Sequence, residues 1–409
     1  MKRYVKYIAA LIACAAMLVG CAGEKQIDYS DTYVDGQDSQ ENFSAYQDMQ
    51  RFAASDKSYY FITDDFDAPF IYEIDKKTQE CHPLCNKSDC LHDKEKDYNK
   101  MTQCGAYIKF PVEKTLVYYD GYLYYAIDYS YQDEDGVWHE QEKICKRDVK
   151  SSTTQIIHTE DEVSFFSIKL HRGHFYIDMT SWEYEGEVGS REATADPDKS
   201  VIYKLPIDGK GKMKKAVNLN KFRKLYPGMF IWGDRYYGNH LFLQIEYIIN
   251  EKLIQTIINY NLQTNEWMDI GDNLDVEIET PFTVFNDKLI FGNGTKIYEC
   301  DFDGTNQREI LDGSKFIKEY VSFKPYCNDG ENLFVSGSSS YKDKSQNIIV
   351  CDKNYNPTVQ KLPIKFPLYV GFDETAFIRF DENKGLLYWI DKSDYTSKLI
   401  YEFPTSKKE

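Results

Sequence analysis

The chain has 409 residues and a formal net charge of −17, and it is rich in aromatic residues, with 34 Tyr and 24 Phe. A surface this acidic repels phosphate backbones, so the composition argues against nucleic-acid binding and leaves cationic or neutral partners, such as glycans, open. The aromatic content and the lack of Ala- and Leu-rich runs after residue 20 favour β structure over helices.

Residues 1–20 have the features of a lipoprotein signal peptide. A basic start that includes Lys2 and Arg3 is followed by an apolar run, and the small residue Gly20 directly precedes Cys21. The run is too short and too early for a membrane-spanning helix. We expect cleavage before Cys21 and lipid attachment to its thiol, which would anchor an extracytoplasmic protein to the membrane. Because residues 1–20 carry three positive charges, their removal lowers the formal charge to −20.

Residues 21–42 are polar and acidic and show neither a helical nor a strand period. Such a segment cannot bury enough apolar surface to fold, so we expect a disordered tether between the lipid and a folded domain.

From residue 43 to about residue 405, one sequence pattern recurs seven times. Each copy begins with an aromatic or aliphatic strand, and a second strand follows, with Asp or Asn four residues after its start in six of the seven copies. The second strands begin at Ile71, Ile144, Ile202, Ile257, Ile297, Ile348 and Leu387. The shortest intervals between them match the ~40–50 residues of a four-stranded propeller blade. The sequence therefore predicts an all-β protein, a β-propeller of seven blades with six or eight as near alternatives. A pair of β-sandwiches is a weaker alternative because it does not explain the repetition.

The segment IYECDFDGTNQREIL at 297–311, with VIYKLPIDG at 201–209, resembles the blade segments of YWTD-type and related exported propellers. This resemblance implies the propeller fold and does not specify an activity.

The first long interval contains an insertion at about residues 80–106 with the spacing C-x3-C-x4-C-x-H-x11-C. It consists of Cys81, Cys85, Cys90, His92 and Cys104, and His82 lies beside the first cysteine. Thiolates and imidazoles at four converging points could bind zinc. An extracytoplasmic location oxidises thiols, however, so two disulfides are the favoured interpretation and no cofactor is expected. If the thiols are free, His92 becomes a candidate metal ligand.

The insertion also looks like one found in lipid-anchored propellers of Gram-positive bacteria, which are mostly without an assigned activity. The other cysteines of the mature chain, Cys145, Cys300, Cys327 and Cys351, are expected to be small buried residues. Acidic turns at 133–136 and 301–304 lack a complete calcium-loop pattern and are expected to be solvated hairpin turns.

No nucleophile elbow, H-E-x-x-H, P-loop or dinucleotide-binding pattern occurs, so no catalytic residue is assigned. Aromatic residues on two insertions, Tyr131 with Trp138 and Trp182 with Tyr184, are candidates for stacking on a sugar or a peptide. The favoured hypothesis is a lipid-anchored, non-catalytic propeller that binds a glycan, a peptide or an envelope protein.

The alternative hypothesis is a surface enzyme, similar to a polysaccharide lyase or a glycosidase, with its site in the central funnel. An assembly factor in an envelope complex is a weaker possibility. Acidic, basic and His side chains that converge on the channel would indicate the enzyme, whereas apolar or scattered polar side chains would indicate binding.

Overall fold

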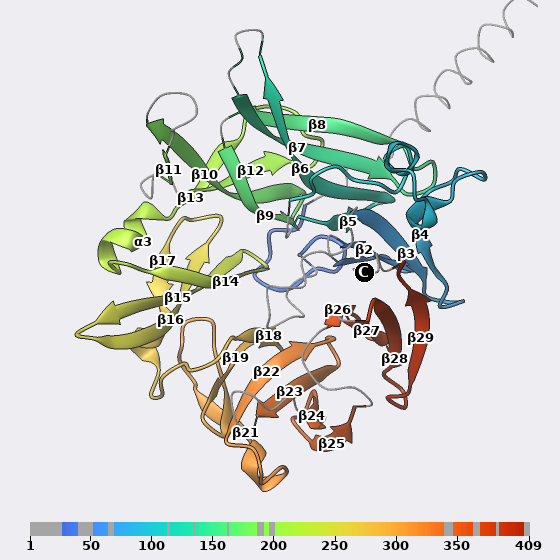
Figure 1. Cartoon of the computed structure of the whole chain (residues 1–409). Helices are drawn as coiled ribbons and strands as arrows, with labels where there is room; N and C mark the ends of the chain where they lie inside the picture. The colour runs from blue at the N-terminus through green and yellow to red at the C-terminus, as the bar shows by residue number, and fades with distance from the viewer. Residues whose placement is uncertain are drawn as a thin grey trace, which may run out of the picture.

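Four antiparallel strands form each unit of the fold, and seven such units are arranged in a ring (Figure 1). The structure is a computed structural model that describes residues 27–39, 52–63, 69–112, 115–133, 136, 138–161, 163–185, 192–195, 201–338, 347–362, 369–381 and 384–404. The predicted seven-bladed β-propeller is confirmed. The signal peptide and Cys21 lie outside the described residues.

The first three blades follow one another along the chain. Blade 1 contains β1 (Phe52–Ala54), β2 (Ser58–Thr63), β3 (Phe70–Asp75) and β4 (Cys81–Pro83). Blade 2 contains β5 (Val117–Tyr119), β6 (Tyr122–Gln132), β7 (Trp138–Asp148) and β8 (Thr154–Asp161). Blade 3 contains β9 (Val163–His171), β10 (His174–Glu185), β12 (Val201–Pro206) and β13 (Lys214–Asn218), and a short extra strand, β11 (Glu192–Ala195), pairs with the end of β10.

The last four blades repeat this order. Blade 4 contains β14 (Phe230–Tyr237), β15 (His240–Ile249), β16 (Lys252–Asn261) and β17 (Trp267–Asp269). Blade 5 contains β18 (Thr283–Phe285), β19 (Lys288–Asn293), β20 (Lys296–Cys300) and β21 (Arg308–Asp312). Blade 6 contains β22 (Ser322–Asn328), β23 (Asn332–Ser338), β24 (Asn347–Asp352) and β25 (Pro357–Lys361), and blade 7 contains β26 (Tyr369–Phe372), β27 (Ala376–Asp381), β28 (Leu386–Asp391) and β29 (Ser397–Glu402).

Helical turns lie on the connections between blades or beside them. They are η3 (His92–Lys94), α2 (Tyr98–Met101), α3 (Asn220–Leu225), η5 (Ile270–Asn273) and η6 (Gly313–Lys315). Within the described ranges, no helix is both long and apolar enough to cross a bilayer.

The recurring Asp of the sequence repeat ends the third strand of a blade and forms the turn that follows. The Asp75 carboxylate accepts hydrogen bonds from the backbone N–H groups of Lys77 (2.9 Å) and Thr78 (2.7 Å), and Asp148 accepts in the same way from Lys150 and Ser151. A side chain that mimics a backbone turn in this way explains why Asp or Asn recurs at this position. In blade 3 the third strand ends at Pro206, and Asp208 takes over the role by accepting from the N–H of Lys210.

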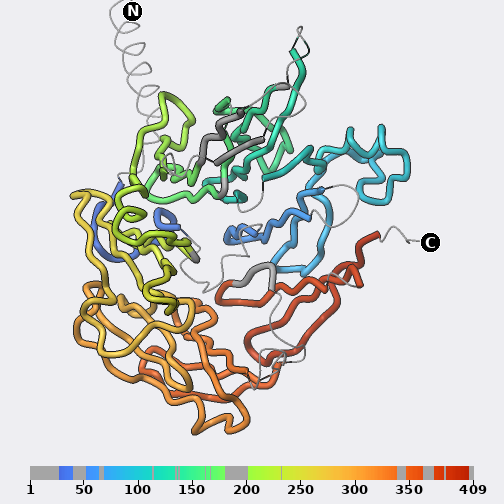
Figure 2. The backbone as a smooth tube through the Cα atoms, turned by 60° about the vertical axis from the view of Figure 1, so that its left-hand side comes forward, coloured from blue at the N-terminus to red at the C-terminus, as the bar shows by residue number. Residues whose placement is uncertain are grey.

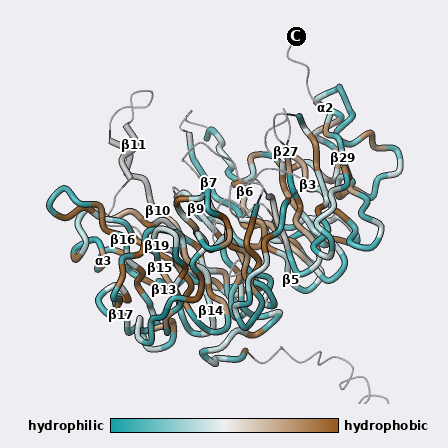
Figure 3. Tube along the Cα trace, turned by 90° about the horizontal axis from the view of Figure 1, so that it is seen from below, coloured by the Kyte–Doolittle hydropathy of each residue, from teal (hydrophilic) through white to brown (hydrophobic). Residues whose placement is uncertain are grey.

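The apolar core lies between neighbouring blades, because each strand presents alternate side chains to the two adjacent sheets. Aromatic rings fill several of these interfaces. Tyr176 of blade 3 lies 4.9 Å from Tyr236 of blade 4, and Phe334 of blade 6 meets Phe377 of blade 7 edge to face at 5.2 Å, measured between ring centroids. The hydrophobic segments accordingly run through the strands, while most turns are hydrophilic (Figure 3).

Blades 1 and 7 lie side by side and close the ring (Figures 1 and 2). Among the described residues, each blade is a continuous stretch of chain, and no strand from one end of the chain completes the sheet at the other end. Closure instead depends on a shared apolar cluster that includes Phe61 and Trp389, and on polar contacts at Asp373. The Asp373 carboxylate accepts a hydrogen bond from the Tyr59 hydroxyl and forms an ion pair with Lys76 at 2.5 Å. We call this interface the seam.

The turns between the first and second strands lie at one end of the ring, and the hairpins between the second and third strands lie at the other. The connections from each blade to the next lie at the same end of the ring as these hairpins. We call the first end the turn face and the second end the hairpin face. The hairpin face therefore includes α2, β11 and the tip of β15–β16 at Asn250 and Glu251, and α2 and β11 lie toward the same side in Figure 3.

The expected disordered tether differs from the structure over residues 27–39, which lie against the turn face of blades 3 and 4. Arg172 donates from Nε to the Asp38 carboxylate and from Nη2 to the Thr32 carbonyl, at 2.8 Å in the second case. The side chain of Asp38 is fully buried. We call residues 27–39 the strap. Its sequence is too polar to form a core of its own, but buried polar partners on the propeller hold it in place.

Candidate functional site

The cysteine-rich insertion is the connection from β4 of blade 1 to β5 of blade 2, on the hairpin face. Two short helical turns organise it. The Asp97 side chain caps the first turn of α2 by accepting from the N–H of Asn99 at 3.0 Å. His92, at the start of η3, has a φ of +55°, a left-handed conformation that a non-glycine residue adopts at some cost. This backbone turn places the His92 ring and the Asp93 carboxylate.

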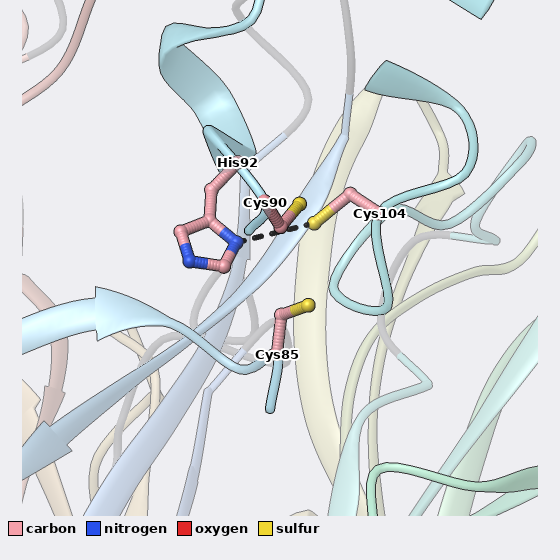
Figure 4. A group of neighbouring side chains, drawn as sticks. All are labelled: Cys85, Cys90, His92 and Cys104. Atoms are coloured by element: carbon pink, nitrogen blue, oxygen red, sulfur yellow. Dashed lines mark hydrogen bonds between the residues drawn. The ribbon is translucent and has the colours of Figure 1, made fainter. Parts of the chain in front are cut away.

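Four side chains of the insertion converge on one point: Cys85, Cys90, His92 and Cys104 (Figure 4). Their sulfur and nitrogen atoms all lie within 4.8 Å of one another, and the Cys104 Sγ lies 3.5 Å from the His92 Nδ1. Cys81, on β4, does not belong to this group. The structure has all of these cysteines as free thiols, so the predicted disulfides are not present in it.

Backbone N–H groups donate to two of the sulfur atoms, and each of these hydrogen bonds acts to lower the pKa of its thiol. The N–H of Gly105 lies 3.3 Å from the Cys85 Sγ, and the N–H of Ala106 lies 3.4 Å from the Cys104 Sγ. Burial acts to raise the pKa of Cys85, but hydrogen bonds from Lys87, Gly105 and neighbouring thiols leave it below its ordinary value. Burial raises the pKa of Cys104 to about 12 and lowers that of His92, so the imidazole is neutral.

Arg147, on β7 of blade 2, supplies positive charge beside this group. Its side chain is almost fully buried, and its guanidinium donates to the Leu84 carbonyl and interacts electrostatically with Cys85 and Cys104. Burying a charge is costly unless an opposite charge or hydrogen bonds compensate it, so the arginine is suited to a site that carries negative charge.

The insertion also contacts the seam. Asp93, the residue after His92, accepts hydrogen bonds from the hydroxyl of Tyr72 on β3 (2.9 Å) and from the hydroxyl of Tyr401 on β29 (2.6 Å). One carboxylate thus joins the first and the last blade, directly next to a member of the four-residue group.

The inner strands carry a second group of charged side chains, between blades 3 and 4. Lys169 on β9 lies 3.8 Å from the carboxylate of Asp234 on β14, and it is completely buried. Burial, together with the charge of Asp234, raises the pKa of Asp178 on β10 to about 7. A funnel enzyme would need such a convergence of charge, but the Lys169 side chain is completely buried.

Of the aromatic candidates, Tyr131 is the one whose side chain lies within the described residues. Its ring stacks on His139, 5.1 Å away across the β6–β7 hairpin, and lies 6.1 Å from Tyr129, so it covers the hairpin itself. Trp138 begins β7 opposite Gln132, and Trp182 and Tyr184 pair with Ala195 and Ala193 of β11. The side chains of Trp138, Trp182 and Tyr184 lie outside the described part of the chain.

The remaining cysteines of the mature chain are buried among apolar neighbours. Cys300 lies in the cluster between blades 4 and 5, and Cys351 lies in the cluster between blades 5 and 6. Cys145 and Cys327 are also buried in apolar clusters. The turn at Asp303 is closed by the N–H of Thr305, which donates to its carboxylate at 2.9 Å, as expected for a hairpin turn.

No family model and no curated protein matches this sequence. Among solved structures, a prolyl endopeptidase is 11% identical with a TM-score of 0.49, over 91% of this chain and 50% of that one, so this chain spans about half its length. The β-propeller domain of the trilobed protease from Pyrococcus furiosus is 12% identical over 71% and 83% of the two chains, with a TM-score of 0.43. An ulvan lyase, a polysaccharide lyase, is 12% identical over 91% and 94%, with a TM-score of 0.41. All three TM-scores are below 0.5, so these similarities support no conclusion about this chain.

A buried carboxyl on blade 2 leads to a prediction about pH. Glu142 is 6% exposed, and burial together with Asp128 raises its pKa to about 8 from the ordinary 4.5. A raised folded-state pKa means that the stability contributed by the protonated form is complete below about pH 4.5 and is lost as the pH rises to 8. We therefore expect Glu142→Gln to stabilise the fold at pH 8 by on the order of 2 kcal/mol and to have little effect at pH 5.

Denaturant unfolding of both proteins at pH 5 and pH 8 measures this difference. Glu251→Gln, at the exposed tip of a hairpin, is the control and should change stability at neither pH. Equal effects of Glu142→Gln at the two pH values would show that Glu142 is ionised in the fold.

Proposed function

We propose that this protein is an extracytoplasmic lipoprotein whose propeller binds a partner protein through its hairpin face and performs no chemistry. The distribution of exposed large apolar side chains is the observation that carries this proposal. Of the seventeen among the described residues, five lie on the outermost strands and one lies on the strap. The other eleven lie on the hairpin face: Leu91, Tyr98, Phe110, Tyr129, Leu225, Phe230, Ile248, Ile249, Leu253, Phe316 and Val321.

The β15–β16 hairpin concentrates this apolar surface. Ile248 and Leu253 are directly opposite each other at its tip and are 65% and 52% exposed, and Ile249 beside them is 50% exposed. The ring of Tyr247 lies 4.9 Å from that of Tyr226, so the end of α3, with the exposed Leu225, lies close to the hairpin. Apolar side chains gathered at one end of a soluble domain are typical of a surface that binds another protein.

The strap supports an orientation for this surface. It begins at Ile27, on the turn face, six residues after the expected lipid attachment at Cys21. Six residues span at most about 20 Å. A lipid on Cys21 would therefore hold the turn face close to the bilayer and direct the hairpin face away from it, toward partners in the envelope.

The alternative of a polysaccharide-directed enzyme has one observation in its favour, the charged group of Lys169, Asp178 and Asp234. A general acid with a pKa of about 7 would suit glycoside chemistry. A polymer cannot reach a completely buried lysine, however, and the ion pair between blades 3 and 4 also serves their packing. Binding therefore accounts for more of the described features than catalysis does.

A pair of double variants tests the binding surface. Ile248→Ser with Leu253→Ser should reduce capture of the envelope partner by at least tenfold, because the variant removes two exposed anchors. Val359→Ser with Leu399→Ser, on the outermost strands of blades 6 and 7, removes comparable exposed apolar surface and should leave capture unchanged. Cross-linking and quantitative pull-down from envelope extracts measure both. Equal capture by both variants would exclude the hairpin face as the binding surface.

The anchor has its own test. Cys21→Ser should leave the unprocessed precursor and abolish incorporation of labelled fatty acid, because the thiol is the expected site of lipid transfer. Metabolic labelling and fractionation of membranes measure this outcome. A Cys21→Ser protein that still carries lipid would contradict the proposed location.

A further inference from the structure

The four converging side chains of the insertion have the geometry of a closed zinc site. With Zn–S bonds of about 2.3 Å and a Zn–N bond of about 2.0 Å, a tetrahedral site separates sulfur from nitrogen by about 3.5 Å and one sulfur from another by about 3.8 Å. The observed distance from the Cys104 Sγ to the His92 Nδ1 is 3.5 Å, and all four atoms lie within 4.8 Å of one another.

Disulfides fit the same arrangement less well. Two bridges among the four cysteines of the insertion would require Cys81 to pair with one of the other three, yet Cys81 lies outside the converging group. A single bridge within the group would leave one thiol and the His92 imidazole without a role. His92 adds a fourth potential ligand of a different chemical type, and a left-handed backbone conformation places it in the group. Metal binding explains this feature, whereas disulfide formation does not.

The surroundings of the group match the charge of a loaded site. Zinc bound to three thiolates and one neutral imidazole carries a net charge of −1, and its binding releases three thiol protons to water. Arg147 places one buried positive charge beside Cys85 and Cys104, and the N–H groups of Gly105 and Ala106 donate to the same two sulfur atoms. These are the outer contacts that orient and stabilise thiolate ligands.

We propose that Cys85, Cys90, His92 and Cys104 bind one structural zinc ion, and that this ion fixes the insertion so that it braces the seam of the ring. Four protein ligands leave no open coordination position, so the site is structural and not catalytic. The mechanical link is Asp93, because fixing His92 also fixes the carboxylate that joins Tyr72 of blade 1 to Tyr401 of blade 7. Zinc bound in the insertion, which is not part of any blade, therefore stabilises the closed ring.

Metal analysis and thiol counting on full-length protein purified without chelator test the site. We expect one zinc per chain and slow alkylation of Cys85, Cys90 and Cys104 until a chelator is added. Cys90→Ser should lower the zinc content at least tenfold, whereas Cys81→Ser, the matched control on β4, should retain one zinc. Two disulfides in this protein, the absence of metal, or equal zinc loss in both variants would overturn the proposal.

Hydrogen exchange tests the link to the seam. Removal of zinc should accelerate amide exchange in β29 and β4 by at least tenfold and leave β16, on the other side of the ring, unchanged. Tyr401→Phe removes the seam hydrogen bond without touching a ligand, so it should retain zinc but show faster exchange in β29. Unchanged exchange in β29 after zinc removal would overturn the bracing role.

Discussion

A chain that ends at Leu311 is expected to lose cooperative folding altogether. This truncation keeps blades 1–5, except for the last residue of β21, and removes blades 6 and 7. It exposes the side of blade 5 that packs on Phe323 and Val335, and the side of blade 1 that packs on Ile378 and Trp389. Each large apolar side chain returned to water costs about 1.5–3 kcal/mol, and a domain has only about 5–15 kcal/mol of net stability. The free energy lost by exposing these side chains therefore exceeds the net folding stability that five blades could provide.

Calorimetry and dye binding to exposed apolar surface distinguish the outcomes. The truncated chain should show no sharp melting transition and should bind the dye at room temperature. The full chain should melt in one sharp transition and should not bind the dye. A five-blade fragment that melts cooperatively within a few degrees of the full chain would show that the blades are independent of ring closure.

Arg172→Ala is expected to release the strap from the turn face. The guanidinium donates to the carboxylate of Asp38 and to backbone carbonyls of the strap, including that of Thr32, and both charged side chains are buried. Removal of the guanidinium leaves the Asp38 carboxylate buried, with the N–H of Gly238 as a donor to it within the described residues. Breaking a buried pair in this way costs about 3–5 kcal/mol, so we expect the strap to leave the turn face in this variant.

Limited proteolysis measures the result, because the strap should become the first site of cleavage while the blades remain intact. Lys252→Ala, which removes an exposed ion pair with Glu277, is the control and should change stability by no more than about 1 kcal/mol. Full protection of residues 27–39 in Arg172→Ala would mean that the ion pair does not hold the strap.

The second and third strands of the blades were predictable from sequence because each combines an apolar run with a turn residue at a fixed offset. Thus Ile297, where the sequence predicts a strand to begin, lies within β20, and the Asp four residues after Ile71 forms the turn after its strand. The innermost strands were not predictable. Strands such as β1 and β18 have only three residues, and their extended conformation depends on pairing with a neighbour, not on their own pattern.

The candidate sites divide in a similar way. The spacing of Cys85, Cys90, His92 and Cys104 indicated either metal or disulfides, and only the three-dimensional arrangement separates Cys81 from the group. The segment that contains the strap was predicted to be disordered because residues 27–39 are mostly polar and show no apolar period. Its partner, Arg172, lies in the turn between β9 and β10 with a φ of +49°, and no motif in the sequence marks it as a partner of the strap.

The continuity of each blade along the chain has a consequence for folding kinetics. Strands that pair within a blade are close in sequence, so their contacts form early and at low entropic cost. The seam is different, because it joins residues as far apart as Tyr59 and Asp373, separated by 314 positions. Closing the ring should therefore be the slow, late step of folding, and the reverse opening between blades 1 and 7 should be the least costly large-scale excursion of the native state. An insertion that contacts both blades then acts on the lifetime of the closed ring more than on the formation of any single blade.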